Sequence, residues 1–259
     1  MKKITAIIGS PRKGDTYAAV QRFEEALKKL EDVEIEYIML SKLNLADCVG
    51  CHNCVIKGRD TCHQAQIIHE LQEKIVAADG VILACPVYNQ SVTAIMKRFL
   101  DYFTFMWHRP ELFGVKFFGI ASGGGVFDGV FKALKTNAVN WGGSWVGSLG
   151  VPHYDALTPK FKQKVDADFA KKAALFLKAL EPKELPRPGL GRLIWFNMWK
   201  MNAVVCRESN PMDFQHWTEK KWMTSSYYYD TKVNPVKKLI AKLVMGMARM
   251  YMHKIYIGY

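Results

Sequence analysis

The sequence contains no hydrophobic run that approaches the roughly 20 residues of a membrane-spanning helix. Its basic start, MKKITAIIGSPRKG, is unlike a signal peptide, because the apolar stretch is short and gives way to charged residues. Internal repeats and low-complexity tracts are also missing. We therefore expect a globular protein that works in the cytoplasm.

Acidic residues are in the minority, with 24 Asp and Glu against 36 Lys and Arg, which gives a formal net charge of +12. Such an excess suits nucleic acid, an anionic membrane surface or phosphorylated cofactors. The basic residues are spread along the chain, and neither a zinc finger nor an RNA-binding signature accompanies them. Nucleic acid is therefore not an expected partner.

Apolar runs alternate with helical patterns over the first 180 residues, and the whole chain is long enough for one main domain and an extension. Five strand-helix units predict an α/β fold, a doubly wound five-stranded parallel sheet with helices on both faces. The predicted strands are 4–8, 33–39, 81–84, 115–121 and 145–149. The predicted helices are 16–30, 64–78, 91–105, 129–140 and 160–180.

A proline-rich segment at 181–189 divides the chain. We expect a main domain at 1–180 and a C-terminal extension at 181–259 that is aromatic, methionine-rich and basic. The extension is predicted to serve as an interface, a lid or a surface helix.

The run GSPRKGDT, residues 9–16, follows the first strand and opens the first helix. A glycine-rich turn before a helix N-terminus presents free backbone N–H groups and a positive dipole end to an anion. The spacing resembles a Walker A loop, but Asp15 stands where the phosphate-binding lysine belongs, which argues against a triphosphate. A single phosphate is one interpretation, and a plain turn with Asp15 or Thr16 as helix cap is the other.

Two further segments follow strands and belong at the same edge of the sheet, where such folds bind their ligands. They are 86–90 and 122–125, and both are rich in turn residues or glycine.

Together, GSPRKGDT, CPVYNQSVTAIMKRFLD and ASGGG resemble, in this order, the flavodoxin-like NAD(P)H-dependent FMN reductase family. The resemblance implies that the first loop binds the FMN phosphate, the second lies along the isoalloxazine ring and the third lies beside the polar edge of the ring. The residues implied are Ser10, Arg12, Gly14, Asp15, Thr16 and Tyr17, then Pro86, Val87, Tyr88, Asn89 and Gln90, then Ser122, Gly123, Gly124 and Gly125. No catalytic side chain is expected, because the flavin carries the chemistry.

The sequence departs from the family pattern at two places. Many relatives have an Asp pair shortly after the last cysteine of the second-strand loop, where this chain has His63-Gln64-Ala65. An arginine commonly follows the aspartate that ends the third helix, where this chain has Asp101-Tyr102.

Four of the six cysteines follow the second predicted strand in a C-x-x-C-x-x-C-x7-C arrangement. Four thiolates so close together suit a 4Fe-4S cluster or zinc in a reducing compartment better than disulfides. The order resembles the motif of iron-sulfur flavoproteins, a branch of the same family, and implies a cluster that takes single electrons from reduced FMN. Free thiols, or a zinc site with His52 or His63, are the alternatives. The implied ligands are Cys48, Cys51, Cys54 and Cys62.

The tail from Asn234-Pro235 to Tyr256 predicts an amphipathic helix with a wide apolar face and lysines opposite. Such a helix packs on its own domain or on a second subunit, or lies on an anionic membrane surface; we expect the packing. Aromatic residues upstream of it suit a cover for a flat cofactor or a subunit interface. The apolar face comprises Val236, Leu239, Ile240, Leu243, Val244, Met247, Met250 and Tyr251.

These patterns predict an FMN-dependent NAD(P)H oxidoreductase that reduces a quinone, a flavin, an aromatic compound or a carrier protein, and that forms a homo-oligomer. One alternative is an iron-sulfur flavoprotein with FMN and a 4Fe-4S cluster. Another is a flavin-free adaptor that binds membranes or partners. The chain has no GxGxxG fingerprint and so does not choose between NADH and NADPH.

Overall fold

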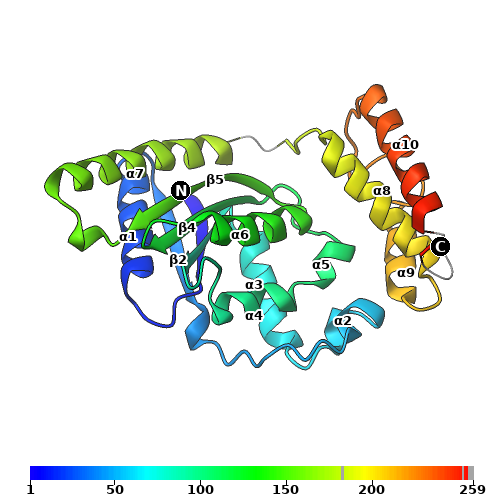
Figure 1. The fold of residues 1–259 in the computed structure, drawn as a ribbon, viewed down its shortest axis with the longest axis horizontal. Helices are drawn as coiled ribbons and strands as arrows, with labels where there is room; N and C mark the ends of the chain where they lie inside the picture. The colour runs from blue at the N-terminus through cyan, green and yellow to red at the C-terminus, as the bar shows by residue number, and fades with distance from the viewer. Residues whose placement is uncertain (182–183, 253, 256–259) are drawn as a thin grey trace. The chain divides into compact units, whose positions relative to one another are not determined.

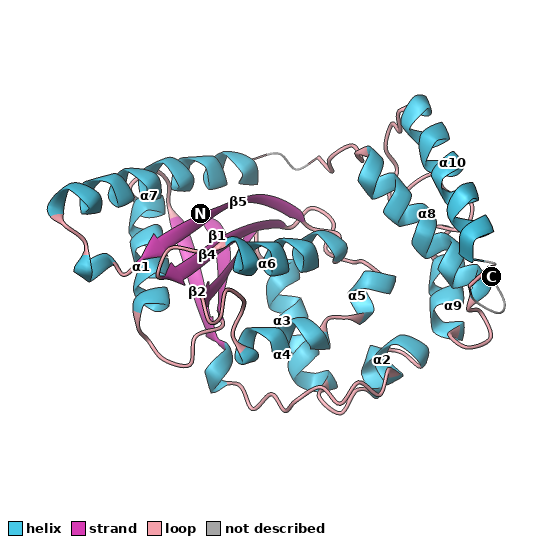
Figure 2. Cartoon of the chain, in the orientation of Figure 1, coloured by secondary structure: helices cyan, strands magenta, loops and turns pink. Residues whose placement is uncertain are grey.

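A computed structural model of the chain describes residues 1–181, 184–252 and 254–255. Within these residues, five parallel strands form one sheet in the order β2-β1-β3-β4-β5 (Figures 1 and 2). The predicted fold class is thereby confirmed. The strands are β1 (Lys2–Ile8), β2 (Val33–Met39), β3 (Gly80–Pro86), β4 (Lys116–Gly123) and β5 (Ser144–Pro152).

The strand sequences reflect their positions in the sheet. Central strand β3 is apolar and buried along nearly its whole length, because helices cover both of its faces. Edge strand β2 places Glu34 and Glu36 in solvent. Between β4 and β5 the register shifts, since Phe117 pairs with Trp145 and Phe118 with Gly147.

Helices α1 (Asp15–Lys28) and α7 (Pro159–Leu180) contact each other and cover one face of the sheet. Alternate strand residues such as Ile4 and Phe118 pack against them, and the Phe23 ring stacks on Phe118 at 4.8 Å between centroids. The helices α3 (Ala65–Ala77) and α6 (Asp128–Asn140) pack against β1 and against β4 and β5, respectively.

The region predicted as one helix at 91–105 is divided. Helix α4 (Ala94–Tyr102) ends at Phe103, and α5 (Phe105–His108) follows as a separate turn. Three short 3₁₀ turns, η1 (Leu40–Lys42), η2 (Arg59–Thr61) and η3 (Tyr154–Ala156), lie outside the predicted elements.

The chain divides into two compact units, one made of Met1–Cys51 with His63–Glu184 and the other of His52–Cys62 with Leu185–Tyr259. The second unit contains α2 (Asn53–Ile56), α8 (Leu190–Val205), α9 (Pro211–Glu219) and α10 (Pro235–Met252). Within it, α10 and α9 both pack on α8, and α2 contacts α9.

Aromatic side chains form the core of this second unit. Phe196, Trp217, Trp222 and Tyr227 are buried, and the Trp217 ring lies 5.4 Å from Phe196 and 5.3 Å from Trp222. The sequence predicts that the aromatic residues upstream of the tail helix cover a cofactor or a partner. This expectation is wrong for Trp217, Trp222 and Tyr227, because they are buried in the core of their own unit.

Of the predicted linker, Pro182 and Lys183 lie outside the described residues, as does Tyr256 at the end of the predicted tail helix. Among the helices of the described residues, none has the length and hydrophobicity needed to cross a membrane.

Candidate functional site

The segments that follow β1, β3 and β4 line one pocket of about 160 Å³ in the first unit. Each segment leaves the carboxyl end of its strand, the edge at which doubly wound sheets bind ligands. Tyr17, Asn89, Gln90 and Gly125, although singled out in the sequence, lie outside the lining. The lining residues are Ser10, Arg12, Gly14, Asp15, Thr16, Pro86, Val87, Tyr88, Ser122, Gly123, Gly124 and His153.

The β1–α1 loop brings hydroxyl, guanidinium and backbone N–H groups to one end of the pocket. Ser10 is buried, and its Oγ donates a hydrogen bond to the backbone oxygen of Arg12 at 2.8 Å. Gly14 is the N-cap of α1 and supplies no side-chain cap, so the interpretation in which Asp15 or Thr16 caps this helix is wrong. The first turn of α1 therefore keeps N–H groups that have no partner within the helix.

Thr16 is held by a contact that crosses the pocket. Its Oγ1 lies 2.6 Å from Oγ of Ser122, and both residues are buried. This hydrogen bond joins the first turn of α1 to the end of β4, so two walls of the pocket are fixed relative to each other.

The β3–α4 loop contains a tight turn whose shape depends on the backbone. Tyr88 and Ser91 exchange two backbone hydrogen bonds, and the residues between them, Asn89 and Gln90, have φ of 48° and 59°. Two left-handed central residues are typical of a type I′ turn. Tyr88 is 49% exposed, so it is a surface aromatic at the pocket and not a core residue.

Two neighbouring segments hold this turn in place. Val87 N donates to the backbone oxygen of Ser122 at 2.8 Å. A Cβ on Gly129, in the first turn of α6, would lie 1.8 Å from the backbone oxygen of Gln90, so only glycine allows this approach.

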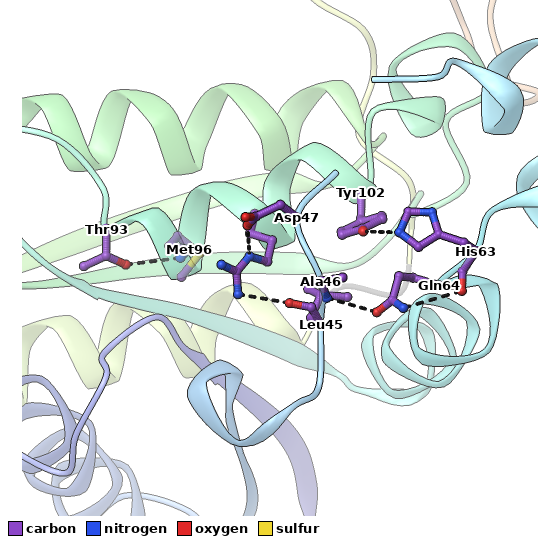
Figure 3. A network of polar contacts seen from close by, with 9 residues as sticks. Leu45, Ala46, Asp47, His63, Gln64, Thr93, Met96 and Tyr102 are labelled. Carbon is purple, nitrogen blue, oxygen red and sulfur yellow. Dashed lines mark hydrogen bonds and ion pairs between the residues drawn. The ribbon is translucent and has the colours of Figure 1, made fainter. Parts of the chain in front are cut away.

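Thr93, the N-cap of α4, joins the second loop to the first. Its Oγ1 accepts from Met96 N at 3.1 Å (Figure 3) and donates to the backbone oxygen of Gly9 at 2.6 Å. Cys85 Sγ accepts from Thr93 N at 3.4 Å, and burial raises the pKa of this thiol. Cys85 is fully buried.

The β4–α6 loop exposes main chain to the pocket. A Cβ on Gly124 would meet no atom within 4 Å, so open space lies beside this backbone. A flat ring could approach the main chain closely here, because no side chain intervenes.

His153, which directly follows β5, was not singled out in the sequence. Its Nδ1 lies 2.7 Å from Oδ2 of Asp15 at the start of α1. His153 could have been predicted from its position directly after the fifth strand, since that strand ends at the same edge of the sheet as the three loops. The contact with His153 gives the Asp15 carboxylate a side-chain partner at a helix end that attracts anions.

None of the four cysteines of the C-x-x-C-x-x-C-x7-C arrangement takes part in a disulfide bond among the described residues. Cys48 and Cys51 are exposed and belong to the first unit, whereas Cys54 and Cys62 are half-buried and belong to the second. Among the described residues, no three His, Cys, Asp or Glu side chains are gathered closely enough to hold a metal ion. The four thiols are of the ligand type that binds an iron-sulfur cluster, and they are divided equally between the two units.

The first-unit stem of this loop is held by polar contacts (Figure 3). Arg98 Nε donates to Oδ1 of Asp47 at 2.6 Å, and Ala46 N donates to Oε1 of Gln64 at 3.2 Å. His63 Nε2 lies 3.1 Å from the hydroxyl of Tyr102. The two places at which the sequence departs from the family pattern therefore contact each other.

Comparison with known proteins assigns the chain to a family. A family model described as NADPH-dependent FMN reductase matches residues 2–161. An iron-sulfur flavoprotein of Clostridioides difficile is 29% identical over 218 residues, which cover 82% of this chain and 91% of that protein. An iron-sulfur flavoprotein of Archaeoglobus fulgidus is 40% identical over 114 residues, or 43% of this chain and half of that protein.

Among solved structures, an azoreductase from Bacillus anthracis superposes with a TM-score of 0.53 at 14% identity, covering 70% of this chain and all of that one. This likeness shows the fold, a flavodoxin-like arrangement that agrees with the sheet order described above. On the match over residues 2–161, the chain belongs to the NADPH-dependent FMN reductase family of oxidoreductases.

Proposed function

We propose that this chain binds FMN in the pocket formed by its β1–α1, β3–α4 and β4–α6 loops, and passes reducing equivalents from NAD(P)H to an acceptor. One observation carries the proposal: three segments far apart in the sequence, each after a parallel strand, line a single pocket. The main domain, residues 1–180, would be the FMN-binding part.

The β1–α1 end of the pocket suits the phosphate. The N–H groups of the first turn of α1 and the guanidinium of Arg12 are hydrogen-bond donors, and the helix dipole adds positive potential. The Ser10 hydroxyl donates to the backbone oxygen of Arg12 and so shapes the loop; it would bind the phosphate only by turning its proton away from that oxygen. Thr16 lies on the same turn, and its hydroxyl is already engaged with Ser122. Its side chain would therefore position this loop, while its backbone N–H belongs to the first helical turn, whose N–H groups have no partner within the helix.

The other end of the pocket suits the ring. Pro86, Val87 and Tyr88 form one wall, and Gly124 leaves backbone accessible on another. Gly123, beside it, packs closely on Val87. When bound, FMN supplies hydride acceptance at N5 and onward electron transfer. The chain needs to hold the ring, shape its access and tune its potential, and no side chain of the pocket has to act as an acid.

Half-exposed Tyr88 stands where an aromatic acceptor or nicotinamide would arrive, and it offers a ring for stacking. An exposed aromatic ring at the pocket supports an aromatic acceptor, which could be a quinone, a flavin, a nitroaromatic or an azo compound. An electron-carrier protein is the alternative acceptor. A cytoplasmic location and a homo-oligomeric state are part of the same proposal.

A second candidate function is that of an iron-sulfur flavoprotein, fed by a carrier such as ferredoxin, in which Cys48, Cys51, Cys54 and Cys62 hold a 4Fe-4S cluster. The similarity to the Clostridioides difficile iron-sulfur flavoprotein over 82% of the chain favours it. Four cysteines within one loop, none of them in a disulfide bond among the described residues, are the ligand type that such a cluster requires.

The deciding experiment is an absorption spectrum of anaerobically purified protein, with iron and sulfide assays on the same sample, followed by anaerobic addition of NADH or NADPH. We expect flavin bands that bleach on addition of a nicotinamide. Matched iron and sulfide, with bleaching only by dithionite or ferredoxin, would establish the second candidate. Protein that takes up no FMN after reconstitution would overturn both and leave the adaptor interpretation.

A further inference from the structure

Helix α10 turns a continuous apolar stripe to solvent. Its members are spaced three or four residues apart and so lie on one helical face, and each side chain is between 58% and 64% exposed. Single exposed apolar residues are ordinary, but a row along a whole helix marks an interaction surface. The stripe consists of Val236, Leu239, Leu243, Met247 and Met250.

The helix is held in its unit by the opposite face. Ala241 is fully buried where α10 packs on α8, and Lys238 Nζ donates to Oγ of Ser226 at 2.6 Å. The exposed members of the wide apolar face are therefore not packed on their own unit, and the other form of the expectation, packing on a second subunit, stays a prediction. Ala241 is the buried residue of α10, Val244 and Met245 are half-buried, and the residues of the stripe are exposed.

The charge around the stripe has one sign. Between Pro235 and Met252 the chain has four cations and no Asp or Glu, and exposed Lys242 and Arg249 flank the stripe. From residue 185 to 259 there are twelve Lys and Arg against four Asp and Glu, so this part carries +8 of the net +12.

We propose that α10 docks on an anionic lipid membrane surface, with the stripe at the boundary between headgroups and acyl chains and the flanking cations on the lipid phosphates. A basic helix with an exposed apolar face has the chemistry of such surface-bound helices. A second copy of the chain fits less well. Two α10 helices paired through their stripes would bring cations together, and the described helix offers no carboxylate to separate them.

The test uses the full chain and sedimentation with vesicles of phosphatidylcholine alone or with about one-third phosphatidylglycerol. Two variants separate the contributions: Leu239→Gln/Leu243→Gln/Met247→Gln removes the stripe and keeps the charge, whereas Lys242→Glu/Arg249→Glu keeps the stripe and reverses the charge. The matched control replaces three apolar residues that are exposed on the first unit, Leu30→Gln/Val76→Gln/Leu175→Gln. Circular dichroism and flavin content report whether each variant is folded.

We expect the wild-type chain and the control to bind the anionic vesicles at least about tenfold more tightly than the neutral ones. High salt should reduce this preference, because it screens the attraction between the cations and the lipid phosphates. Both α10 variants should lose about tenfold or more of that affinity. Equal binding by wild type and the triple α10 variant would overturn the proposal. So would a wild-type dimer, seen by sedimentation velocity, that ignores vesicles and dissociates in that variant, because the stripe would then be a subunit interface.

Discussion

Oγ1 of Thr16 and Oγ of Ser122 lie 2.6 Å apart, although 106 residues separate them in the chain. Thr16 belongs to the first turn of α1 after β1, and Ser122 to β4, and strand β3 lies between these two strands in the sheet. Both residues are buried, so the hydrogen bond is shielded from water. It fixes the distance between the proposed phosphate end and ring end of the pocket.

Replacing one residue of this pair should lower the free energy of unfolding more than replacing both. Thr16→Val leaves the Ser122 hydroxyl buried without its partner, which lowers the free energy of unfolding by about 1–3 kcal/mol. Thr16→Val/Ser122→Ala should recover part of that loss. Urea unfolding of the two single variants and the double variant measures the coupling. Thr158→Val, at an exposed helix N-cap without a side-chain cap bond, is the control, and additive losses in the cycle would contradict the coupling.

Gly129→Ala should damage the β3–α4 loop from a distance. The new Cβ would lie 1.8 Å from the Gln90 carbonyl oxygen, which is backbone and has to move. We expect a loss of about 1–3 kcal/mol in the free energy of unfolding and weaker FMN retention after dialysis. Gly191→Ala, whose Cβ would meet no atom within 4 Å, serves as control. Retention and stability equal to those of the control would show that the Tyr88–Ser91 turn is not fixed by Gly129.

Ser10→Ala/Arg12→Ala should weaken FMN binding about 10- to 100-fold, since a hydrogen bond to a charged group contributes about 1.5–3 kcal/mol. Fluorescence titration of the apoprotein with FMN and with riboflavin measures the effect. The loss should appear with FMN and not with riboflavin, which has no phosphate. Lys13→Ala is the matched control, because Lys13 is the neighbouring cation and is absent from the pocket lining. An equal loss for both ligands would contradict the phosphate assignment.

Cys51→Ser tests the second candidate function. If the wild-type chain carries iron when purified without oxygen, this variant should lose most of it and keep its FMN, because one thiolate ligand is gone. Cys206→Ser, a cysteine outside the four, should keep both. Iron that stays unchanged in the Cys51→Ser protein would falsify the ligand assignment.

The buried Cys85 thiol should make stability depend on pH in the alkaline range. Burial raises its folded-state pKa above the ordinary 9.0, so above pH 9 the unfolded state binds fewer protons than the folded state. The free energy of unfolding is therefore retained below pH 9 and falls as the pH rises beyond it. Cys85→Ala should show a shallower fall between pH 9 and 10 in urea unfolding than Cys206→Ala. If the free energy of unfolding of the two variants fell in parallel with rising pH, Cys85 would not be the cause of the pH dependence.

The sheet and its three loops could be predicted because their signals are local. An apolar run such as Val81 to Ala84 is continuous only where both faces of a strand are covered, and the order of strands and helices then sets the edge at which the loops meet. Residues from all three predicted loops line the pocket, because the strand order brings these loops to the same edge of the sheet. Asn89 and Gln90 do not line it, and they form the centre of the turn.

The remaining features depend on contacts that no local pattern encodes. His153 lines the pocket beside Asp15, and the two side chains are in hydrogen-bond contact although they are 138 residues apart in the chain. The apolar face of α10 resembles a packing face in the sequence, but Ala241 on the other side packs more closely on α8. The membership of Cys54 and Cys62 in the second unit follows from the packing of α2 on α9, which the spacing of the cysteines does not indicate.

The turn from Tyr88 to Ser91 is held by main-chain hydrogen bonds, by the left-handed conformations of Asn89 and Gln90 and by the close approach of Gly129. None of these restraints involves the Tyr88 side chain. Position 88 is thus free to exchange its side chain while the path of the loop stays the same. Under the proposed function, natural variation or directed evolution at this position would change the range of acceptors without rebuilding the fold.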